Sequence, residues 1–406
     1  MKTEDIHLVI ISQYFPPDVS GGSTRAYNYA KCLADQNFKV TVITAHPHQH
    51  GPVPKNYRNK LTKKEKMGNL DLIRVWVPSL LHSSVKNSAI LNFSFCFTSL
   101  FPLFSIESKP DVILAFEPNL FSIIPAYFYS KLRGGIVLRV VDDMWPELLY
   151  EQKILKSNFL RKRLTHLAKF SYNYSKHIIP LNNEIKEIIH KSYGIDNDKI
   201  DVISHGIDET LFTFTKKERQ KVFTLMYSGS LVNSYDFDII LNAARKLKNK
   251  NIEFVIRGKG KLLSYLQEQK AKFQIDNLVI NSDFVPIDQL STTLSKSDVF
   301  LVPMGKGHSL NTSLPTKILE SQAIGRPIIC CSSGAIGNYV EVTKSGICVD
   351  EGNLDGFIDA ILKLESDEQL CQELGQNGRN SIEKNHKFEV IGKRLSSIIQ
   401  KSLQIT

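Results

Sequence analysis

Short continuous apolar runs recur along the chain, each followed by a polar loop and then by a segment with helical apolar spacing. Continuous apolar runs are typical of strands covered on both faces, because such strands do not alternate polar and apolar positions. The pattern therefore predicts an α/β fold with parallel sheets. The expected strands lie within residues 6–12, 39–44, 111–115, 135–141, 176–183, 223–230, 252–256, 299–303 and 327–331.

Apolar residues recur at helical spacing from Ala26 to Leu33, and residues 363–406 also look helical. Two further segments have an unusual composition. Residues 89–104 are dense in phenylalanine, and residues 153–169 combine leucines with the basic run Arg161–Arg163. Each is either an ordinary core or solvated helix or a helix that lies at a lipid surface.

A chain of 406 residues exceeds what one core usually holds, so we expect two domains. A strand, a glycine-containing loop and a helix occur near the start of each half, which is the phosphate-binding arrangement of a Rossmann-like unit. We place the first domain at residues 1–205 and the second at residues 206–385. A C-terminal helix at residues 386–406 is expected to close across the domains.

The charge balance is basic, since 51 Lys and Arg against 41 Asp and Glu give a net charge of +10. Anionic partners are therefore favoured: membrane phospholipid, nucleic acid or phosphorylated substrates. The six cysteines show no C-x-x-C spacing, so they predict neither a disulfide framework nor a zinc site and fit a reducing cytoplasm. No signal peptide is expected at the acidic N-terminus. Residues 89–104 come nearest to a membrane span but are short and interrupted by polar residues.

The stretch from Val302 to Ile328 carries the clearest chemical signal. A polar loop leads from one strand into a helix that begins near Pro315, and proline suits a first helical turn. A helix N-terminus offers free N–H groups and a positive dipole end, where a diphosphate binds. Lys317 would face that anion, and Glu320, about one turn further on, would accept hydrogen bonds from sugar or ribose hydroxyls. The alternative is the solvated cap of an ordinary helix.

Polar residues also follow two expected strands of the N-terminal half. Asp142 and Asp143 come directly after the run that ends at Val141, at the strand end where α/β sites collect. These carboxylates either orient sugar hydroxyls and act on an acceptor or simply cap a turn. The alternating histidines of residues 46–50 follow another strand, where a solvated or acceptor-side loop is favoured over a metal site.

The segment PTKILESQAIGRP, from Pro315 to Pro327, resembles the nucleotide-sugar motif of the group 1 (family 4) retaining glycosyltransferases. The resemblance runs from Ser12 to the C-terminal helices and is strongest to the bacterial type that builds O-antigen, capsule and similar surface polysaccharides. It implies the GT-B architecture of two facing Rossmann-like domains. It also implies a donor site at the start of this helix, with the candidate residues Ser313, Leu314, Thr316, Lys317 and Glu320.

The resemblance implies further candidates in the N-terminal half. In the family, the first glycine-rich loop lies near the donor phosphates and the acceptor, which makes Gly21, Gly22 and Arg25 candidates. Asp143 keeps a position that the family shares, and we take it with Glu320 as a candidate catalytic residue. Asp142 is a substrate-binding candidate, although it stands where the family often has His or Arg.

The chain departs from the family pattern around the diphosphate. Many members carry an Arg after the glycine that matches Gly229 and a Lys shortly downstream, whereas here Ser230 follows with no close lysine. Arg257 and Lys261, after the next strand, are plausible substitutes.

Two other donor contacts follow from the resemblance. The family holds the base largely through backbone groups of the segment that contains Val285. Thr312 stands where members usually have the first Glu of an E-x7-E pair, so Glu320 is kept for the ribose.

The resemblance implies a metal-independent retaining glycosyltransferase without a cofactor. It would move a hexose or N-acetylhexosamine from a nucleotide diphosphate, UDP by preference, to a lipid-linked or growing polysaccharide acceptor. In the family, retention is usually explained by front-face attack, with the leaving phosphate assisting deprotonation of the acceptor. Such an acceptor predicts a cytoplasmic protein peripheral to the inner face of the membrane. The alternatives are a GT-B nucleotide-sugar 2-epimerase and a basic nucleic-acid-binding protein, although no recognisable nucleic-acid module is present.

Overall fold

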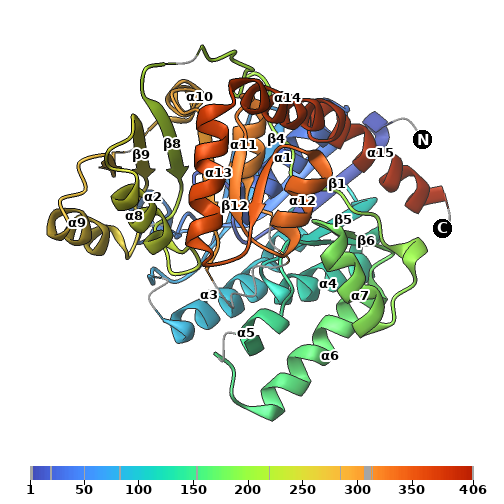
Figure 1. Ribbon diagram of the computed structural model, residues 1–406. Coiled ribbons are helices and arrows are strands. Elements are labelled where there is room, and N and C mark those ends of the chain that lie inside the picture. The colour runs from blue at the N-terminus through green and yellow to red at the C-terminus, as the bar shows by residue number, and fades with distance from the viewer. Residues whose placement is uncertain are drawn as a thin grey trace. The chain divides into compact units, whose positions relative to one another are not determined.

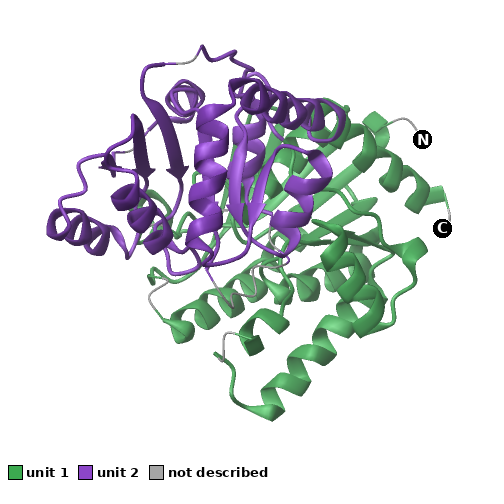
Figure 2. Cartoon of the chain, viewed as in Figure 1, with its two compact units in different colours: residues 1–206, 388–406 green, residues 207–387 purple. Residues whose placement is uncertain are grey.

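The computed structural model describes residues 3–18, 21–49, 51–81, 84–151, 154–218, 220–283, 285–305, 312 and 314–404. The chain forms two compact units (Figure 2), which we treat separately: unit 1, residues 1–206 with 388–406, and unit 2, residues 207–387. The sequence places the boundaries after residues 205 and 385, and the division falls after residues 206 and 387.

The sheet of unit 1 has the strand order β3-β4-β2-β1-β5-β6-β7 (Figure 1). Its strands are β1 His7–Ile11, β2 Lys39–Ala45, β3 Thr62–Met67, β4 Leu70–Val75, β5 Val112–Phe116, β6 Ile136–Val141 and β7 His177–Pro180. Neighbouring strands are parallel, as predicted, except for the antiparallel pair of β3 and β4. The pattern did not predict this hairpin, because β3 alternates exposed and half-buried residues and contains three lysines. Charged residues of this kind are common on edge strands.

Two helical layers cover the sheet of unit 1. On one face, α1 (Gly21–Asp35) and α15 (Phe388–Gln404) pack on residues such as Leu8 and Ile10. The other face, which includes Val9 and Ile11, is covered by α3 (Val85–Thr98), η2 (Phe101–Phe104), α4 (Ile123–Arg133) and α6 (Asn158–Tyr174). The other helices are η1 Thr3–Asp5, α2 Lys55–Arg58, η3 Leu120–Ser122, α5 Glu147–Glu151, α7 Asn183–Tyr193 and η4 Asn197–Lys199. Alternate residues of each strand thus supply separate cores on the two faces.

Unit 2 contains a parallel sheet with the order β10-β9-β8-β11-β12-β13. Its strands are β8 Phe223–Ser228, β9 Ile252–Arg257, β10 Leu278–Asn281, β11 Val299–Pro303, β12 Ile328–Cys331 and β13 Gly346–Val349. Its helices are α8 Phe237–Lys246, α9 Leu263–Lys272, α10 Ile287–Leu294, α11 Thr316–Ala323, α12 Ala335–Thr343, α13 Leu354–Ser366 and α14 Glu368–Asn385. Helices α8 and α13 bury apolar side chains against β8, β9 and β11, and α11 packs against α14.

Parallel strands end at one edge of their sheet, and the loops that leave this carboxyl edge collect there. In unit 1 these loops include Gln13, Glu117 and Asp142, which follow β1, β5 and β6. In unit 2, Gly229 and Gly258 follow β8 and β9 in the same way. The candidate residues of both units therefore lie mainly at carboxyl edges.

Candidate functional site

The helix that the stretch from Val302 to Ile328 predicts is α11, which begins at Thr316. Pro315 precedes it at the N-cap position with φ of −63°, where the missing N–H costs no helical hydrogen bond. Leu314 is buried and Thr316 is half-buried. The candidate Ser313 lies outside the described residues. The first turn of α11 presents N–H groups that have no partner within the helix.

Lys317, in this first turn, has an aromatic environment. Its Nζ donates a hydrogen bond to Tyr227 Oη at 3.0 Å and lies 4.2 Å and 4.0 Å from the ring centroids of Tyr227 and Tyr235. Among the described residues, no carboxylate forms an ion pair with it. Burial lowers the pKa of Lys317 to about 7, and the carboxylate of Glu320 acts in the opposite direction.

Two glycines leave room in front of this lysine. Gly229 has φ of +147°, and a Cβ there would lie 2.6 Å from Lys317 Nζ. Gly258 has φ of +149°, and a Cβ there would lie 1.8 Å from the Gly229 carbonyl oxygen. Gly229 N–H also donates to the Arg257 carbonyl at 3.0 Å. Only glycine permits this close approach of the loops after β8 and β9.

The remaining donor candidates lie in the same unit. Glu320 is half-buried one turn beyond Lys317, and burial raises the pKa of its carboxyl group. Arg257 is half-buried and Lys261 is exposed, and neither side chain has a hydrogen bond or ion pair among the described residues. Val285 is half-buried between β10 and α10. Both basic side chains remain available to an anion.

In unit 1, Arg25 occupies a different environment from the one expected. It is fully buried, forms an ion pair with Asp142, and donates to the carbonyls of Val141 at 3.0 Å and Ile203 at 2.7 Å. It also donates to Tyr29 Oη at 2.9 Å. Protein partners thus enclose Arg25 in this structure, which points to a structural contact with Asp142, and the contact of Arg25 with substrate stays a prediction.

The other candidates of unit 1 lie at the carboxyl edge. A Cβ on Gly22 would lie 3.0 Å from Pro118 Cδ and 3.6 Å from Asp142 Oδ2, while one on Gly21 would have no described atom within 4 Å. Asp142 Oδ2 is buried without a hydrogen-bond partner among the described residues. Burial, and then the neighbouring Asp142, raise the pKa of the half-buried Asp143 to about 6.

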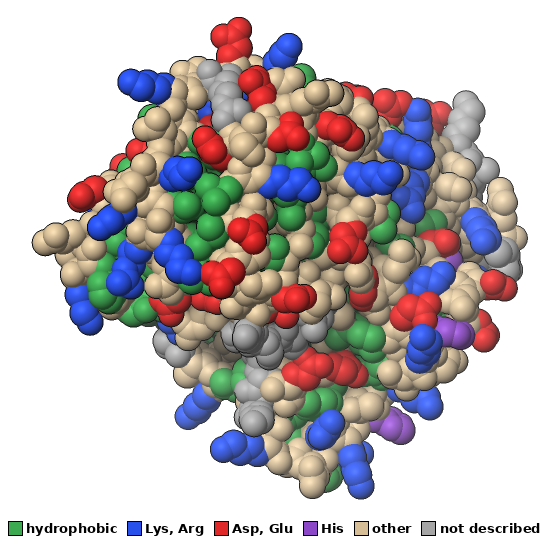
Figure 3. Space-filling model, viewed as in Figure 1, with side chains coloured by type: hydrophobic (Ala, Val, Ile, Leu, Met, Phe, Trp, Pro, Cys, Tyr) green, Lys and Arg blue, Asp and Glu red, His purple; other side chains and the backbone are tan. Residues whose placement is uncertain are grey.

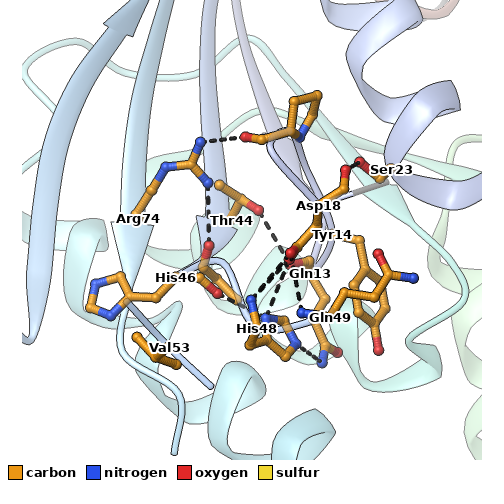
Figure 4. A network of polar contacts seen from close by, with 12 residues as sticks. Gln13, Tyr14, Asp18, Ser23, Thr44, His46, His48, Gln49, Val53 and Arg74 are labelled. Atoms are coloured by element: carbon orange, nitrogen blue, oxygen red, sulfur yellow. Dashed lines mark hydrogen bonds and ion pairs between the residues drawn. The ribbon is translucent and has the colours of Figure 1, made fainter. Parts of the chain in front are cut away.

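Figure 4 shows how the loops after β1 and β2 are tied together. The backbone N–H of His48 donates to the Asp18 carboxylate at 3.2 Å, and its ring stacks on Tyr14 with centroids 5.3 Å apart. The amide of Gln13 reaches His48 at 3.4 Å and accepts from Asn119, after β5, at 2.7 Å. His48 thus belongs to a buried network that fixes three loops of this edge.

His46 is also fully buried, and its two ring nitrogens have no partner among the described residues. Burial and the nearby Arg74 guanidinium lower its pKa to about 4. Residue 50 lies outside the described residues. Over the described part of the chain, no group of three or more His, Cys, Asp or Glu side chains is placed to hold a metal ion.

The sequence analysis did not single out several residues that lie in these candidate sites. Tyr227 lies in an apolar strand and resembled a core residue, and Tyr235 carried no motif at all. Gly258 lies between the candidates Arg257 and Lys261 and was not singled out, although the pair Gly258 and Gly260 directly after a strand is a usable signal for close backbone approach. Glu117 and Arg139, a fully buried ion pair at 3.0 Å beside the edge of unit 1, also went unnoticed.

Two family models match successive parts of the chain. The model "Glycosyltransferase Family 4" matches residues 19–211, and the model "Glycosyl transferases group 1" matches residues 208–381. Together they span most of both units. The chain therefore belongs to the group 1 glycosyltransferases of GT-B architecture.

Individual relatives agree with this assignment. The chain is 27% identical over 235 residues to an Escherichia coli UDP-Gal:alpha-D-GlcNAc-diphosphoundecaprenol alpha-1,3-galactosyltransferase, covering 53% of this chain and 58% of that protein. The chain spans about half the length of the curated relatives that it matches.

Solved structures share the fold over nearly the whole chain. Sucrose-phosphate synthase from Thermosynechococcus elongatus is 13% identical, with a TM-score of 0.77, over 99% of this chain and all of that one. HepE of Anabaena, crystallised with UDP, is 11% identical, with a TM-score of 0.67, over 98% of this chain and all of that one. At these identities the likeness shows the GT-B fold alone.

Proposed function

We propose that this protein is a retaining glycosyltransferase that moves a hexose or N-acetylhexosamine from a UDP-sugar to a lipid-linked or growing surface polysaccharide. The observation that carries the proposal is the lysine at the start of α11. Lys317 lies next to Gly229 in the first turn of a helix whose N-cap residue makes no side-chain capping bond, and it has no carboxylate partner among the described residues. Such a site suits an anion with several oxygens, which a diphosphate provides.

The chemistry requires charge neutralisation. When the bond from the sugar C1 to the diphosphate breaks, negative charge grows on the leaving oxygen, and Lys317 with the α11 N–H groups stabilises it. Arg257 and Lys261 supply further positive charge, and Glu320 accepts hydrogen bonds from the ribose. The acceptor oxygen bonds to C1 on the same face, and its proton passes to a departing phosphate oxygen. No metal ion takes part in this scheme.

The choice of donor and reaction draws on the relatives. The Escherichia coli relative is named for UDP-galactose, and HepE was crystallised with UDP. Both matched family models are glycosyltransferase models, which favours transfer over 2-epimerisation. We therefore assign uridine to the donor and leave the sugar to experiment.

A thermal-shift and hydrolysis panel of UDP-, GDP-, dTDP- and ADP-sugars tests the proposal. We expect stabilisation by the UDP-sugars, with slow release of sugar. Lys317→Ala should lower turnover by about 10²-fold, as removal of a group that stabilises developing charge does in other enzymes. Lys363→Ala, at an exposed lysine of α13, is the matched control and should leave turnover unchanged. Equal turnover in both variants would contradict the proposal.

The acceptor side of the proposal includes a membrane surface, formed by the layer of α3, η2, α4 and α6 in unit 1. We name its exposed side chains the aromatic–basic face. Its exposed apolar members include Phe97, Phe101, Phe104, Phe128 and Phe159, of which Phe104 is 81% exposed. Its exposed basic members include Lys86, Lys131, Arg161, Lys162 and Arg163. In Figure 3, Lys and Arg side chains stand beside hydrophobic ones at the lower end, where Figure 1 shows α6, and Asp and Glu side chains border this region above.

The positive charge of this layer favours an anionic membrane surface as its binding partner. Residues 85–104, 120–133 and 158–174 together contain seven Lys or Arg and no Asp or Glu. Basic residues beside exposed aromatic rings suit a bilayer that contains anionic phospholipid. Residues 85–104 have the length and composition to cross a membrane. However, Leu91 and Phe95 are buried in the core of unit 1, so we propose that this segment lies along the membrane surface instead.

Vesicle binding tests this face. The protein should sediment with phosphatidylcholine vesicles that contain phosphatidylglycerol, and salt should weaken the binding. Replacing Phe97, Phe101 and Phe104 by Ser should weaken binding by about tenfold or more, because the rings no longer enter the interface. Val342→Ser with Phe273→Ser, at exposed apolar residues of unit 2, is the control. If vesicle binding changed neither with the content of anionic lipid nor with the three substitutions, the result would contradict a membrane face.

A further inference from the structure

The partners of Lys317 form an aromatic cage, which consists of Tyr227 and Tyr235. The Tyr227 and Tyr235 rings meet edge to face, with centroids 5.3 Å apart, and the ammonium lies against both. Ring faces attract a cation through their quadrupole but carry no net charge. The cage therefore holds the lysine side chain without neutralising it.

A hydrogen bond to Tyr227 fixes the direction in which the Lys317 side chain points. Tyr227 Oη donates to the Ser230 carbonyl at 2.6 Å, so its oxygen lone pairs accept from Lys317 Nζ at 3.0 Å. An ammonium has three N–H donors, and among the described residues this bond uses one. The other two donors remain for a ligand next to Gly229.

The walls of the cage are themselves anchored. Tyr227 is fully buried and packs edge to face on Phe237, with centroids 4.9 Å apart. The segment around Tyr235 pairs with the end of β11: Asp236 N–H donates to the Pro303 carbonyl at 2.8 Å. Both rings thus have fixed positions, as a positioning role requires.

We propose that Tyr227 and Tyr235 are positioning residues that aim Lys317 across Gly229 at the donor diphosphate, and that the donor binds together with one proton taken up by Lys317. The inference rests on the proposed function and deepens it. The two rings replace water on one side of the half-buried Lys317 side chain, and this desolvation favours the neutral amine in the free protein. An arriving diphosphate supplies the missing negative charge, and Lys317 then takes a proton from solvent to become an ammonium.

The pH dependence follows from this exchange. Because burial lowers the pKa of Lys317 to about 7, roughly nine-tenths of the amine is neutral at about pH 8 in the free protein. Donor binding raises this pKa, so close to one proton should be taken up at about pH 8 and few at about pH 6. Donor affinity should fall by up to about tenfold per pH unit above 7.

The titration of Lys317 must be distinguished from the titrations of the groups that face it. Glu320 on α11 is the charged neighbour that acts on Lys317, and burial raises the pKa of its carboxyl group too. The pKa of Tyr235 is raised to about 12 by burial, and that of Tyr227 is raised further, so both phenols stay neutral over this range. Glu320→Gln therefore removes the one competing titration without touching the cage.

The test is calorimetry of UDP-sugar binding in buffers of different ionisation enthalpy, which counts the protons taken up. A nucleotide sugar is a better probe than UDP, because the terminal phosphate of UDP titrates near pH 6. We expect uptake of close to one proton at about pH 8 in the wild-type protein and in Glu320→Gln. Lys317→Arg, whose guanidinium stays charged, should bind with no proton uptake and a flat pH profile.

Substitutions of Tyr227 and Tyr235 distinguish a positioning role of the cage from a purely structural role in folding. Tyr235→Leu removes a ring, which lets water reach the amine, so proton uptake should fall well below the wild-type value. Tyr235→Phe keeps the ring and should restore wild-type uptake, a contrast that a merely structural role would not produce. Tyr227→Phe removes only the hydroxyl and should raise the KM for the donor while keeping most of the uptake.

The outcomes distinguish this inference from the proposed function. A wild-type protein that binds a UDP-sugar without proton uptake, or a Tyr235→Leu variant with full uptake, overturns the inference alone. A wild-type protein that binds no nucleotide sugar overturns both.

Discussion

The two units each hold a basic side chain near the carboxyl edge of a parallel sheet, fully buried for Arg25 and half-buried for Lys317, and their surroundings differ. Arg25 in unit 1 forms an ion pair with Asp142, and donates to Tyr29 and to backbone carbonyls. Within the described part of the chain, Lys317 in unit 2 makes one hydrogen bond, to Tyr227, and faces a glycine. The comparison teaches that a basic side chain near a carboxyl edge does not by itself define an anion site. What distinguishes the proposed site is a basic group without a carboxylate ion pair among the described residues.

The largest expected effect comes from replacing Arg25, which tests whether its charge is needed to compensate Asp142. Arg25→Met leaves Asp142 as an uncompensated buried carboxylate, which should lower the free energy of unfolding by about 3–5 kcal/mol. Lys317→Met should change it by no more than about 1 kcal/mol, because no buried charge loses its partner. Urea denaturation of the two variants gives both values.

A double variant supplies the control for Arg25. Replacing Arg25 by Met and Asp142 by Leu removes both charges, so most of the lost stability should return. If Arg25→Met were as stable as wild type but failed to bind donor, Arg25 would be a ligand and the comparison would be wrong.

A smaller effect, on the donor KM, is expected when a methyl group is added at Gly229, next to Lys317. Gly229→Ala places a Cβ 2.6 Å from Nζ and forces a non-glycine residue to φ of +147°. The lysine must move, so we expect the KM for the donor to rise about tenfold, with a loss of unfolding free energy of about 1–3 kcal/mol from backbone strain. Steady-state kinetics with the donor varied would measure the first effect.

Gly68→Ala serves as its control. Gly68 also has positive φ, at +56°, but no described atom would lie within 4 Å of a Cβ there. It should show a strain cost without a change in donor KM. A similar KM change in both variants would mean that strain, not the position of Lys317, explains the effect.

The fold was largely predictable because buried parallel strands leave continuous apolar runs. Four strands were missed. Three of them lie at sheet edges and lack such runs: β3 alternates exposed and half-buried residues, and β10 and β13 are strands of only four residues. The fourth, β4, is mostly buried and is not an edge strand, but Asp71 and Arg74 interrupt its apolar run. The C-terminal helix α15 was predicted as a helix, and it belongs to unit 1 with α1.

The site was predictable only where its chemistry is local. Lys317 was found because a proline and a polar loop mark the start of its helix. Its partner Tyr227 lies 90 residues earlier in the chain, so nothing near either residue indicates the contact. Arg25 was made a substrate candidate by the family resemblance, and its contact with Asp142 could not be foreseen because the two residues are 117 positions apart. Motifs identify the residues that bear charge but not which of them the fold neutralises.

The smallest effect concerns Asp143, which stays a predicted catalytic residue. Its carboxyl pKa is raised to about 6, first by burial and then by the neighbouring Asp142. If the carboxylate orients the acceptor hydroxyl, turnover should fall as the pH drops through about 6 and the group becomes protonated. Asp143→Asn should lower turnover by several-fold at about pH 7.5 and abolish this acidic limb. A pH–rate profile with donor saturating measures both effects, and the donor KM should not change, because Asp143 belongs to unit 1. An acidic limb that persists in Asp143→Asn would assign the titration to another group and leave Asp143 as a turn residue.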